Sequence, residues 1–206
     1  MADAEQPQIY LVTPSQVDLQ TFPDQLGAIL DAVDIACVRI ELAADDEDTI
    51  SRACDAIRVV AHARDVPVVI TDHVALVERL GLDGVHLRDG ARSVRKLRKD
   101  LGGDAIIGAY CGATRHDGLS AGEAGADYVS FGPVRETALG HGDVADMDLF
   151  TWWSEMVEVP IVAEGAIDLE AAKELAPVAD FICLGSEIWG QEDPLSALKS
   201  YVAAIA

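Results

Sequence analysis

The amino-acid sequence predicts a single-domain α/β protein over residues 1–206, folded as a closed barrel of eight parallel strands with helices outside, a (β/α)8 TIM barrel. Eight short apolar runs recur along the chain, and the stretch after each one has the pattern of a helix or a loop. Continuous apolar runs are typical of strands buried on both faces, and their alternation with helices indicates a parallel sheet. Eight such units close this barrel. The 206 residues leave little room for a second domain. The predicted strands are Ile9–Val12, Ile35–Ile40, Val66–Ile70, Asp83–Leu87, Ala105–Tyr110, Asp127–Phe131, Val159–Ala163 and Asp180–Leu184.

Helices are expected between these runs. In the helix predicted at Asp46–Arg64, the apolar residues, among them Ile50, Ile57 and Ala61, recur with a 3.6-residue period and so lie on one face. Asp46 or Asp48 is expected to cap its start, and an aspartate followed by a helix predicts the same role for Asp72. The predicted helices are Asp46–Arg64, Asp72–Leu80, Ser93–Leu101, Leu119–Ala124, Met147–Met156, Leu169–Leu175 and Pro194–Ala204.

The chain is strongly acidic, with 36 Asp and Glu against 15 Lys and Arg and a net charge of −21. This charge repels phosphate backbones and anionic lipid, so neither nucleic acid nor a membrane is an expected partner. The N-terminus lacks a signal-peptide pattern, and no apolar stretch approaches the roughly 20 residues that span a bilayer, so a cytoplasmic location is expected. The four cysteines have no metal-binding spacing, and Cys37 and Cys183, which lie within predicted strands, are expected to be buried thiols. Trp152, Trp153 and Trp189 fit either a homodimer interface or packing between helices.

In such a barrel, chemistry is confined to the loops that follow the strands. Gly165 and Gly185 end the seventh and eighth predicted strands, where backbone N–H groups often bind a phosphate. Glu164 counts against this interpretation, since a carboxylate beside a phosphate is repulsive. The loop from residue 132 to about residue 145 is the longest, and loops of this kind are usually functional or mobile. The length of this loop therefore indicates either a lid over the substrate or a flexible insertion.

Earlier strand ends add candidates. Arg39 has a fork that suits a phosphate, although pairing with Glu41 is an equally good expectation. Asp72 is a candidate for binding Mg²⁺ together with a pyrophosphate. His86 lies within a strand pattern and is either a site residue or a hydrogen-bonded core residue.

Three segments resemble the thiamine-phosphate synthase and TenI family: DGVHL at 83–87, GADYVSFGPV at 125–134 and VPIVA at 159–163. Their order and spacing agree from about Val66 to Ser186, and GADYVSFGPV is the most specific of them. The resemblance implies the same (β/α)8 barrel. It also implies binding of a thiazole phosphate, which the synthases couple to a pyrimidine pyrophosphate with the help of Mg²⁺. TenI-type relatives isomerise the thiazole phosphate without a metal.

The family's residues carry over only in part. Gln-x-Arg-x-Lys after strand two corresponds to Cys37, Arg39 and Glu41, so only the arginine is kept. The metal-side aspartate after strand three is Asp72. The second metal-binding aspartate falls on Ala91, with Asp89 two residues away, so Asp72 and Asp89 are the candidate metal ligands.

The loops after strands five to eight also keep only some of the family's residues. In the loop after strand six Thr137 is kept, but the expected lysine is Gly140, and Arg135 is a candidate to supply its charge. The thiazole phosphate end corresponds to Gly165-Ala166 and Gly185-Ser186. His116 lies after strand five, a few residues later than the histidine of the TenI-type tautomerases.

Three functions therefore stay open: a thiamine-phosphate synthase, a TenI-like thiazole phosphate isomerase, and a non-catalytic paralogue that binds a phosphorylated small molecule or a protein partner. The synthase implies Mg²⁺, whereas the other two imply no cofactor. A small phosphorylated heterocycle is the expected ligand. The candidate catalytic residues are Arg39, Asp72, His116 and Arg135, and the candidate binding residues are Thr137, Gly165, Ala166, Gly185 and Ser186.

Overall fold

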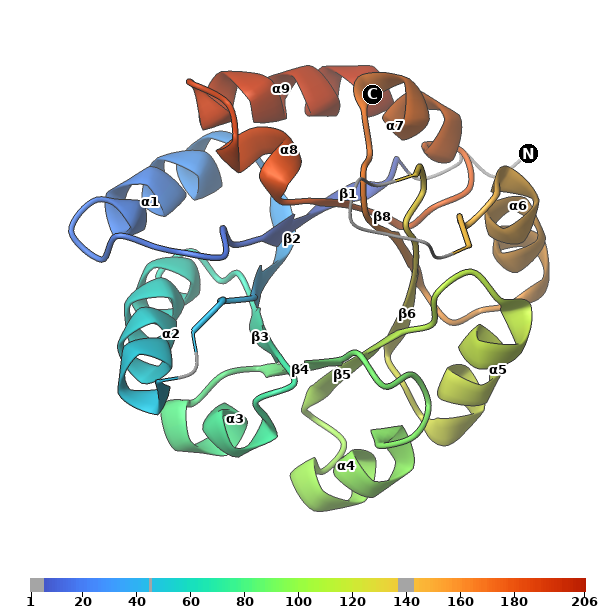
Figure 1. Cartoon of the computed structure of the whole chain (residues 1–206), viewed down its shortest axis with the longest axis horizontal. Helices are drawn as coiled ribbons and strands as arrows, with labels where there is room; N and C mark the ends of the chain where they lie inside the picture. The colour runs from blue at the N-terminus through green and yellow to red at the C-terminus, as the bar shows by residue number, and fades with distance from the viewer. Residues whose placement is uncertain (1–5, 45, 137–142) are drawn as a thin grey trace.

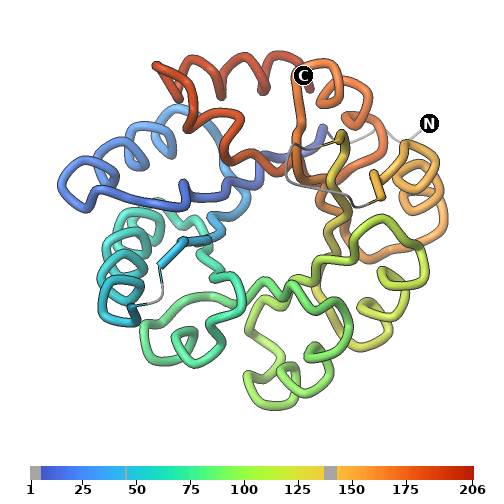
Figure 2. The backbone as a smooth tube through the Cα atoms, viewed as in Figure 1, coloured from blue at the N-terminus to red at the C-terminus, as the bar shows by residue number. Residues whose placement is uncertain are grey.

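The computed structural model describes residues 6–44, 46–136 and 143–206, and it confirms the barrel. Eight parallel strands close in the order β1 to β8, and β8 pairs with β1. Figure 1 shows the ring of strands surrounded by helices, and Figure 2 shows the chain passing once around this ring. Every predicted strand is present. The strands are β1 (Gln8–Val12), β2 (Ile35–Ile40), β3 (Val68–Thr71), β4 (Gly84–Leu87), β5 (Ile106–Tyr110), β6 (Tyr128–Phe131), β7 (Ile161–Ala163) and β8 (Phe181–Leu184).

Three strands begin one residue later than predicted, after an aspartate that has a structural role. Each of these carboxylates accepts a hydrogen bond from a backbone N–H of the preceding strand: Asp83 from Val68 (2.6 Å), Asp127 from Ile107 (2.6 Å) and Asp180 from Ile161 (2.8 Å). The aspartates of DGVHL and GADYVSFGPV therefore tie neighbouring strands together at their amino ends, away from the loops that carry chemistry.

The helices agree with the sequence pattern except at a few ends. Asp46 caps α2, since its side chain accepts from the Thr49 N–H. The helix α5 begins at Arg115, before the predicted Leu119, because the Thr114 side chain caps it. The helices α1 and α8 were not predicted. The helices are α1 (Phe22–Ala32), α2 (Glu47–His62), α3 (Val74–Leu80), α4 (Val94–Leu101), α5 (Arg115–Ala124), α6 (Met147–Met156), α7 (Leu169–Leu175), α8 (Ser186–Trp189) and α9 (Pro194–Ile205).

The core has two parts. The larger part lies between the strands and the helices, and the smaller one fills the barrel interior with Tyr10, Cys37, Val69, Tyr128, Val162 and Cys183. All four cysteines are buried free thiols, which confirms the prediction for Cys37 and Cys183. Trp153 is buried and its Nε1 donates to the Val159 carbonyl at 2.8 Å, which confirms packing between elements for this tryptophan. Within the described residues, no helix has both the length and the apolar composition needed to cross a membrane.

Candidate functional site

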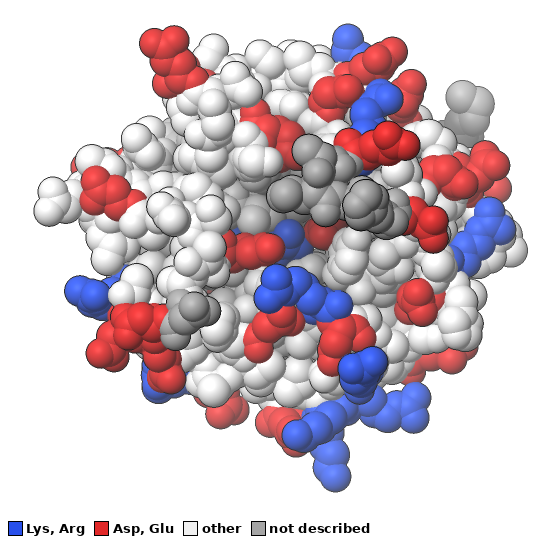
Figure 3. Space-filling model, viewed as in Figure 1, with Lys and Arg blue, Asp and Glu red and all other residues white. Residues whose placement is uncertain are grey.

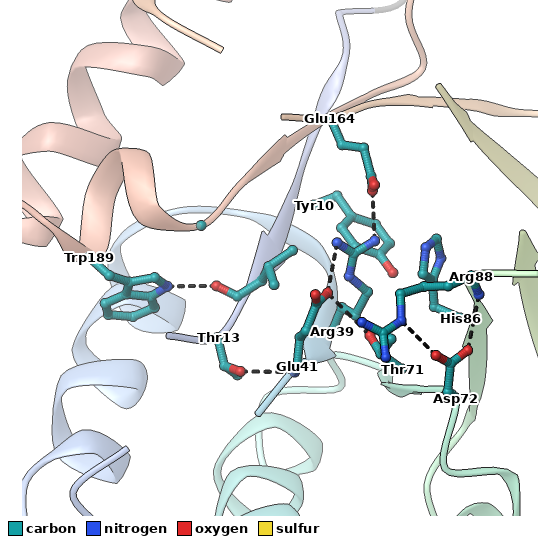
Figure 4. A network of polar contacts seen from close by, with 12 residues as sticks. Tyr10, Thr13, Arg39, Glu41, Thr71, Asp72, His86, Arg88, Glu164 and Trp189 are labelled. Carbon is teal, nitrogen blue, oxygen red and sulfur yellow. Dashed lines mark hydrogen bonds and ion pairs between the residues drawn. The ribbon is translucent and has the colours of Figure 1, made fainter. Parts of the chain in front are cut away.

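Arg39 is the centre of a buried ion-pair cluster at the carboxyl ends of the strands (Figure 4). Its side chain is only 8% exposed; Nη1 donates to Glu164 Oε2 at 2.7 Å, and Nη2 lies 3.2 Å from Glu41 Oε2. Burial by itself lowers the pKa of Arg39, but Glu164 leads the neighbouring groups that outweigh burial and hold the pKa well above its usual value. The expected pairing with Glu41 is confirmed, and Glu164 is an additional partner. Arg39 is thus a fixed cation at the mouth of the barrel.

A chain of hydrogen bonds lies beside Arg39 inside the barrel. The hydroxyl groups of Tyr10 and Tyr128 are 2.6 Å apart, and His86 Nδ1 lies 3.0 Å from the Tyr128 hydroxyl. The Arg39 guanidinium lies over the Tyr10 ring, 5.8 Å from its centroid. Burial raises the pKa of Tyr10 and of Tyr128 well above the usual tyrosine value. Burial lowers the pKa of His86 well below the usual histidine value. These three side chains are therefore neutral near pH 7. Of the two interpretations of His86, a site residue or a hydrogen-bonded core residue, the structure supports the core residue.

A cavity of about 470 Å³ opens beside this cluster, between the ends of β1, β2, β7 and β8. Arg39, predicted as a catalytic residue, and the predicted phosphate-end residues Gly165, Gly185 and Ser186 all line it. Trp189 also lines the cavity, and its Nε1 donates to the Val12 carbonyl at 2.6 Å. Residues that the sequence singled out separately are therefore brought into one cavity.

The walls of this cavity are acidic. Glu41, Glu164 and Glu187 line it, and Arg39 is the one cation among the described residues of its lining. The N–H of Gly185 donates to Glu187 Oε2 at 2.9 Å, so this donor already has an internal carboxylate as its acceptor. A phosphate bound there has to displace that carboxylate.

Asp72 and Arg88 form a second pair at the neighbouring ends of β3 and β4 (Figure 4). Asp72 Oδ1 accepts from the Arg88 backbone N–H at 3.0 Å, and Oδ2 accepts from Arg88 Nε at 2.6 Å. Asp72 has a φ of +59° and precedes His73, which is the N-cap residue of α3. The expectation that Asp72 caps this helix is therefore wrong, because its carboxylate is directed to Arg88 instead.

The two predicted metal ligands share a groove but do not form a magnesium site as they stand. Asp72 and Asp89 line a groove of about 480 Å³ together with the cations Arg88 and Lys96. Asp89 Oδ2 accepts from the Ser93 hydroxyl at 2.6 Å, and both Asp72 oxygens are bonded to Arg88. Over residues 6–44, 46–136 and 143–206, no three His, Cys, Asp or Glu side chains are grouped so that they could hold a metal. Mg²⁺ needs unoccupied oxygen ligands in near-octahedral geometry, which this donor set does not offer.

The other predicted site residues, as far as they are described, line neither the cavity beside Arg39 nor the groove beside Arg88. Arg135 Nε lies 3.2 Å from Asp168 Oδ2, and its Nη2 lies within 4 Å of two further carboxylates of α7. His116 is exposed in the first turn of α5. Ala166 has a φ of +55°, next to the cavity-lining Gly165. Thr137 falls outside the described residues, and so does the middle of the predicted lid, residues 137–142. Their roles stay predictions.

Three residues of the site were not identified from the sequence. Tyr10 and Tyr128 lie within predicted strands and gave no signal beyond apolar character, since only the barrel register brings their hydroxyls together. Glu187 follows the Gly185-Ser186 pair, but its return to the Gly185 N–H depends on the turn into α8. The alternation of side chains along β6 does place Tyr128 on the same side as Ser130, and this signal could have assigned Tyr128 to the interior.

The face seen in Figure 3 is hollowed at its centre and carries acidic groups around most of its rim, with basic groups near the middle and over α4. Fold and site together define a (β/α)8-barrel protein with a polar, largely acidic cavity at the carboxyl ends of its strands.

Comparisons with known proteins show to which family of (β/α)8-barrel proteins the chain belongs. A family model described as thiamine monophosphate synthase matches residues 9–188. The chain is 41% identical over 196 residues to the thiamine-phosphate synthase of Rhodospirillum centenum, covering 94% of this chain and 95% of that one. It is 34% identical over 213 residues to the thiamine-phosphate synthase of Erythrobacter litoralis, covering 100% and 99%. The chain therefore belongs to the thiamine monophosphate synthase family.

A solved structure gives the same architecture. The thiamine phosphate pyrophosphorylase from Pyrococcus furiosus superposes with a TM-score of 0.83 at 21% identity, covering 96% of this chain and 95% of that one. At this identity the likeness supports the fold alone.

Proposed function

We propose that this protein is a thiamine-phosphate synthase, which joins a thiazole phosphate to a pyrimidine pyrophosphate at the mouth of the barrel. The observation that carries the proposal is that Arg39, Gly165, Gly185 and Ser186 surround one cavity in a chain of this family. Backbone N–H groups after β7 and β8 bind the thiazole phosphate, as such loops do in other barrels. In this proposal Ala166 and Thr137 belong to the same binding role.

The reaction breaks the bond between the pyrimidine methylene carbon and a pyrophosphate oxygen, and the electron pair leaves with pyrophosphate. The thiazole ring nitrogen supplies the pair for the new carbon–nitrogen bond, so positive charge develops first on the pyrimidine and ends on the thiazole ring. The carboxylates of Glu41 and Glu164 line the cavity and stabilise this positive charge electrostatically. Arg39 fixes both carboxylates in place, and it thereby acts on the reaction through them.

The family resemblance implies Mg²⁺ for this reaction, with Asp72 and Asp89 as its ligands. Because both Asp72 oxygens are bonded to Arg88, the donor set does not fit the ion, and no step of the proposal passes through a metal. The isomerase alternative, in which His116 or His86 moves a proton, gains no support. His116 is exposed on α5, His86 is buried against Tyr128, and neither is among the described residues that line the cavity.

The test is chromatographic detection of thiamine phosphate after the purified protein is incubated with both substrates, and with each substrate omitted in turn. Product is expected only with both. Ser186→Ala is expected to raise the KM for the thiazole phosphate about tenfold to a hundredfold, the effect of losing one hydrogen bond to a charged group, and to leave the KM for the pyrimidine unchanged. Ser200→Ala, on the exposed side of α9, is the matched control. Absence of product with both substrates would refute the proposal.

A further inference from the structure

We infer that Arg88 supplies the positive charge that a divalent cation would otherwise supply beside Asp72, so that the protein binds the pyrophosphate end of its substrate through a guanidinium group. This inference rests on the proposed function, because it concerns how the leaving pyrophosphate of that reaction is held.

The Asp72–Arg88 pair is fixed by the backbone as well as by the side chains. Residues Thr71 and His86 are partners in the register of β3 and β4, so Asp72 and Arg88 follow directly at neighbouring strand ends. The Asp72 N–H donates to the His86 carbonyl at 3.0 Å, and the Asp72 carboxylate accepts from the Arg88 N–H at 3.0 Å. The guanidinium Nε then bonds to the second carboxylate oxygen at 2.6 Å. The pairing of β3 with β4 thus fixes the Arg88 guanidinium beside the Asp72 carboxylate.

A divalent cation at Asp72 would share the carboxylate with this guanidinium. The two positive charges would repel each other, and the ion would have to break both hydrogen bonds to obtain its oxygen ligands. An arginine guanidinium is not deprotonated in proteins, so Arg88 stays charged. Asp72 is therefore already neutralised by a group that belongs to the chain.

The rest of the Arg88 guanidinium is available to a ligand. Its side chain is 63% exposed, and among the described residues the Nη groups have no hydrogen-bond partner. Arg88 lines both the groove that contains Lys96 and a smaller cavity of about 180 Å³ that contains Glu41 and Thr71. A planar guanidinium matches two oxygens of a phosphate group at once, and Lys96 adds a second cation on the groove wall. When the carbon–oxygen bond breaks, the pyrophosphate keeps the electron pair, and Arg88 donates hydrogen bonds to it without transferring a proton.

The test uses inorganic pyrophosphate as the probe, titrated calorimetrically into the protein in EDTA and in excess MgCl₂. The wild type is expected to bind in EDTA with a dissociation constant within about threefold of that in Mg²⁺, and Arg88→Gln to lose about tenfold or more in EDTA. Mg²⁺ is expected to restore binding to Arg88→Gln, because Asp72 is then free to bind the metal. Asp72→Asn in the Arg88→Gln background removes that rescue. Arg95→Gln, an exposed residue of α4, is the matched control and is expected to bind as the wild type does.

Two results would overturn the inference: wild-type binding that requires Mg²⁺, or Arg88→Gln binding in EDTA as tightly as the wild type. Thiamine phosphate formation in the same two buffers separates this inference from the proposed function. Metal-free pyrophosphate binding without product in either buffer would refute the proposed function and support the inference. Product that forms only with Mg²⁺, together with metal-dependent binding, would support the function and refute the inference.

Discussion

Arg39 and Glu164 are 125 positions apart in the chain and are joined by a hydrogen-bonded ion pair of 2.7 Å. The pair links β2 to the loop after β7, across the two intervening strands β1 and β8. Both side chains are largely buried, with 8% and 15% of their surface exposed. The pair therefore shapes the wall of the cavity and sets its charge.

Glu164→Gln should destabilise the protein strongly, because it leaves the buried Arg39 with only the weaker Glu41 contact. Breaking a buried pair from one side costs about 3 kcal/mol or more. Glu41→Gln is the matched change at a side chain that is 39% exposed, where an ion pair contributes about 1 kcal/mol or less. Urea unfolding of both variants measures the difference. Equal losses for the two variants would show that Glu164 is not the main partner of Arg39.

His86 should make the folded protein less stable as the pH falls below 6.5. Burial lowers the pKa of His86 in the folded state well below 6.5, so the unfolded state binds a proton first as the pH falls. The stabilisation is complete above the unfolded pKa, and it is lost below it at no more than about 1.4 kcal/mol per pH unit. The free energy of unfolding of wild type and His86→Gln, compared between pH 7 and pH 5, measures this term. A wild-type slope that persists unchanged in His86→Gln would contradict it.

Gly108→Ala should disrupt the hydrogen-bond chain inside the barrel. A Cβ at this position would lie 2.0 Å from Tyr128 Cζ, and Tyr128 is held by Tyr10 and His86. Overpacking of this kind costs about 1–3 kcal/mol, and here the upper end is expected. Gly103→Ala is the control, since a Cβ there meets no heavy atom within 4 Å. Thermal unfolding compares the two, and an unchanged melting temperature for Gly108→Ala would show that Tyr128 can move aside freely.

Glu187→Gln should bind phosphate more tightly than the wild type. The substitution removes a negative charge that now accepts the Gly185 N–H, so a phosphate displaces a weaker competitor. A difference of about 0.5–1.5 kcal/mol, or roughly twofold to tenfold in the dissociation constant, is expected from one hydrogen bond. Calorimetric titration with thiazole phosphate measures it, with Glu192→Gln as a control of equal charge change outside the cavity. Weaker binding by Glu187→Gln would mean that the carboxylate contacts the ligand favourably.

The strands could be predicted because a strand buried on both faces leaves an uninterrupted apolar run, as in β2, whose predicted bounds are those observed. The helix α1 was missed although Phe22, Leu26 and Ile29 are buried at helical spacing, because its polar surroundings resemble a loop. The short α8 was missed since four residues give no periodicity.

The site could be predicted only where position along the chain decides the outcome. Gly165, Gly185 and Arg39 were found because strand ends meet at one face of a barrel. The partner of each charged group depends on the strand register and on the direction of the side chain, and neither can be predicted from the sequence alone. Arg88 directly follows the predicted strand Asp83–Leu87, yet its bond to Asp72 follows from the pairing of β3 with β4. Arg135 was expected to act on pyrophosphate, and its nearest carboxylates belong to α7 and its N-cap.

The proposed reaction joins two heterocycles at the mouth of this barrel, with loss of pyrophosphate. The most direct measurement is a single turnover with the protein in excess over both substrates, in which thiamine phosphate and pyrophosphate are quantified together. Both products are expected to appear at the same rate and in equal amounts. Pyrophosphate release without thiamine phosphate, or neither product from protein that binds the thiazole phosphate, would contradict it.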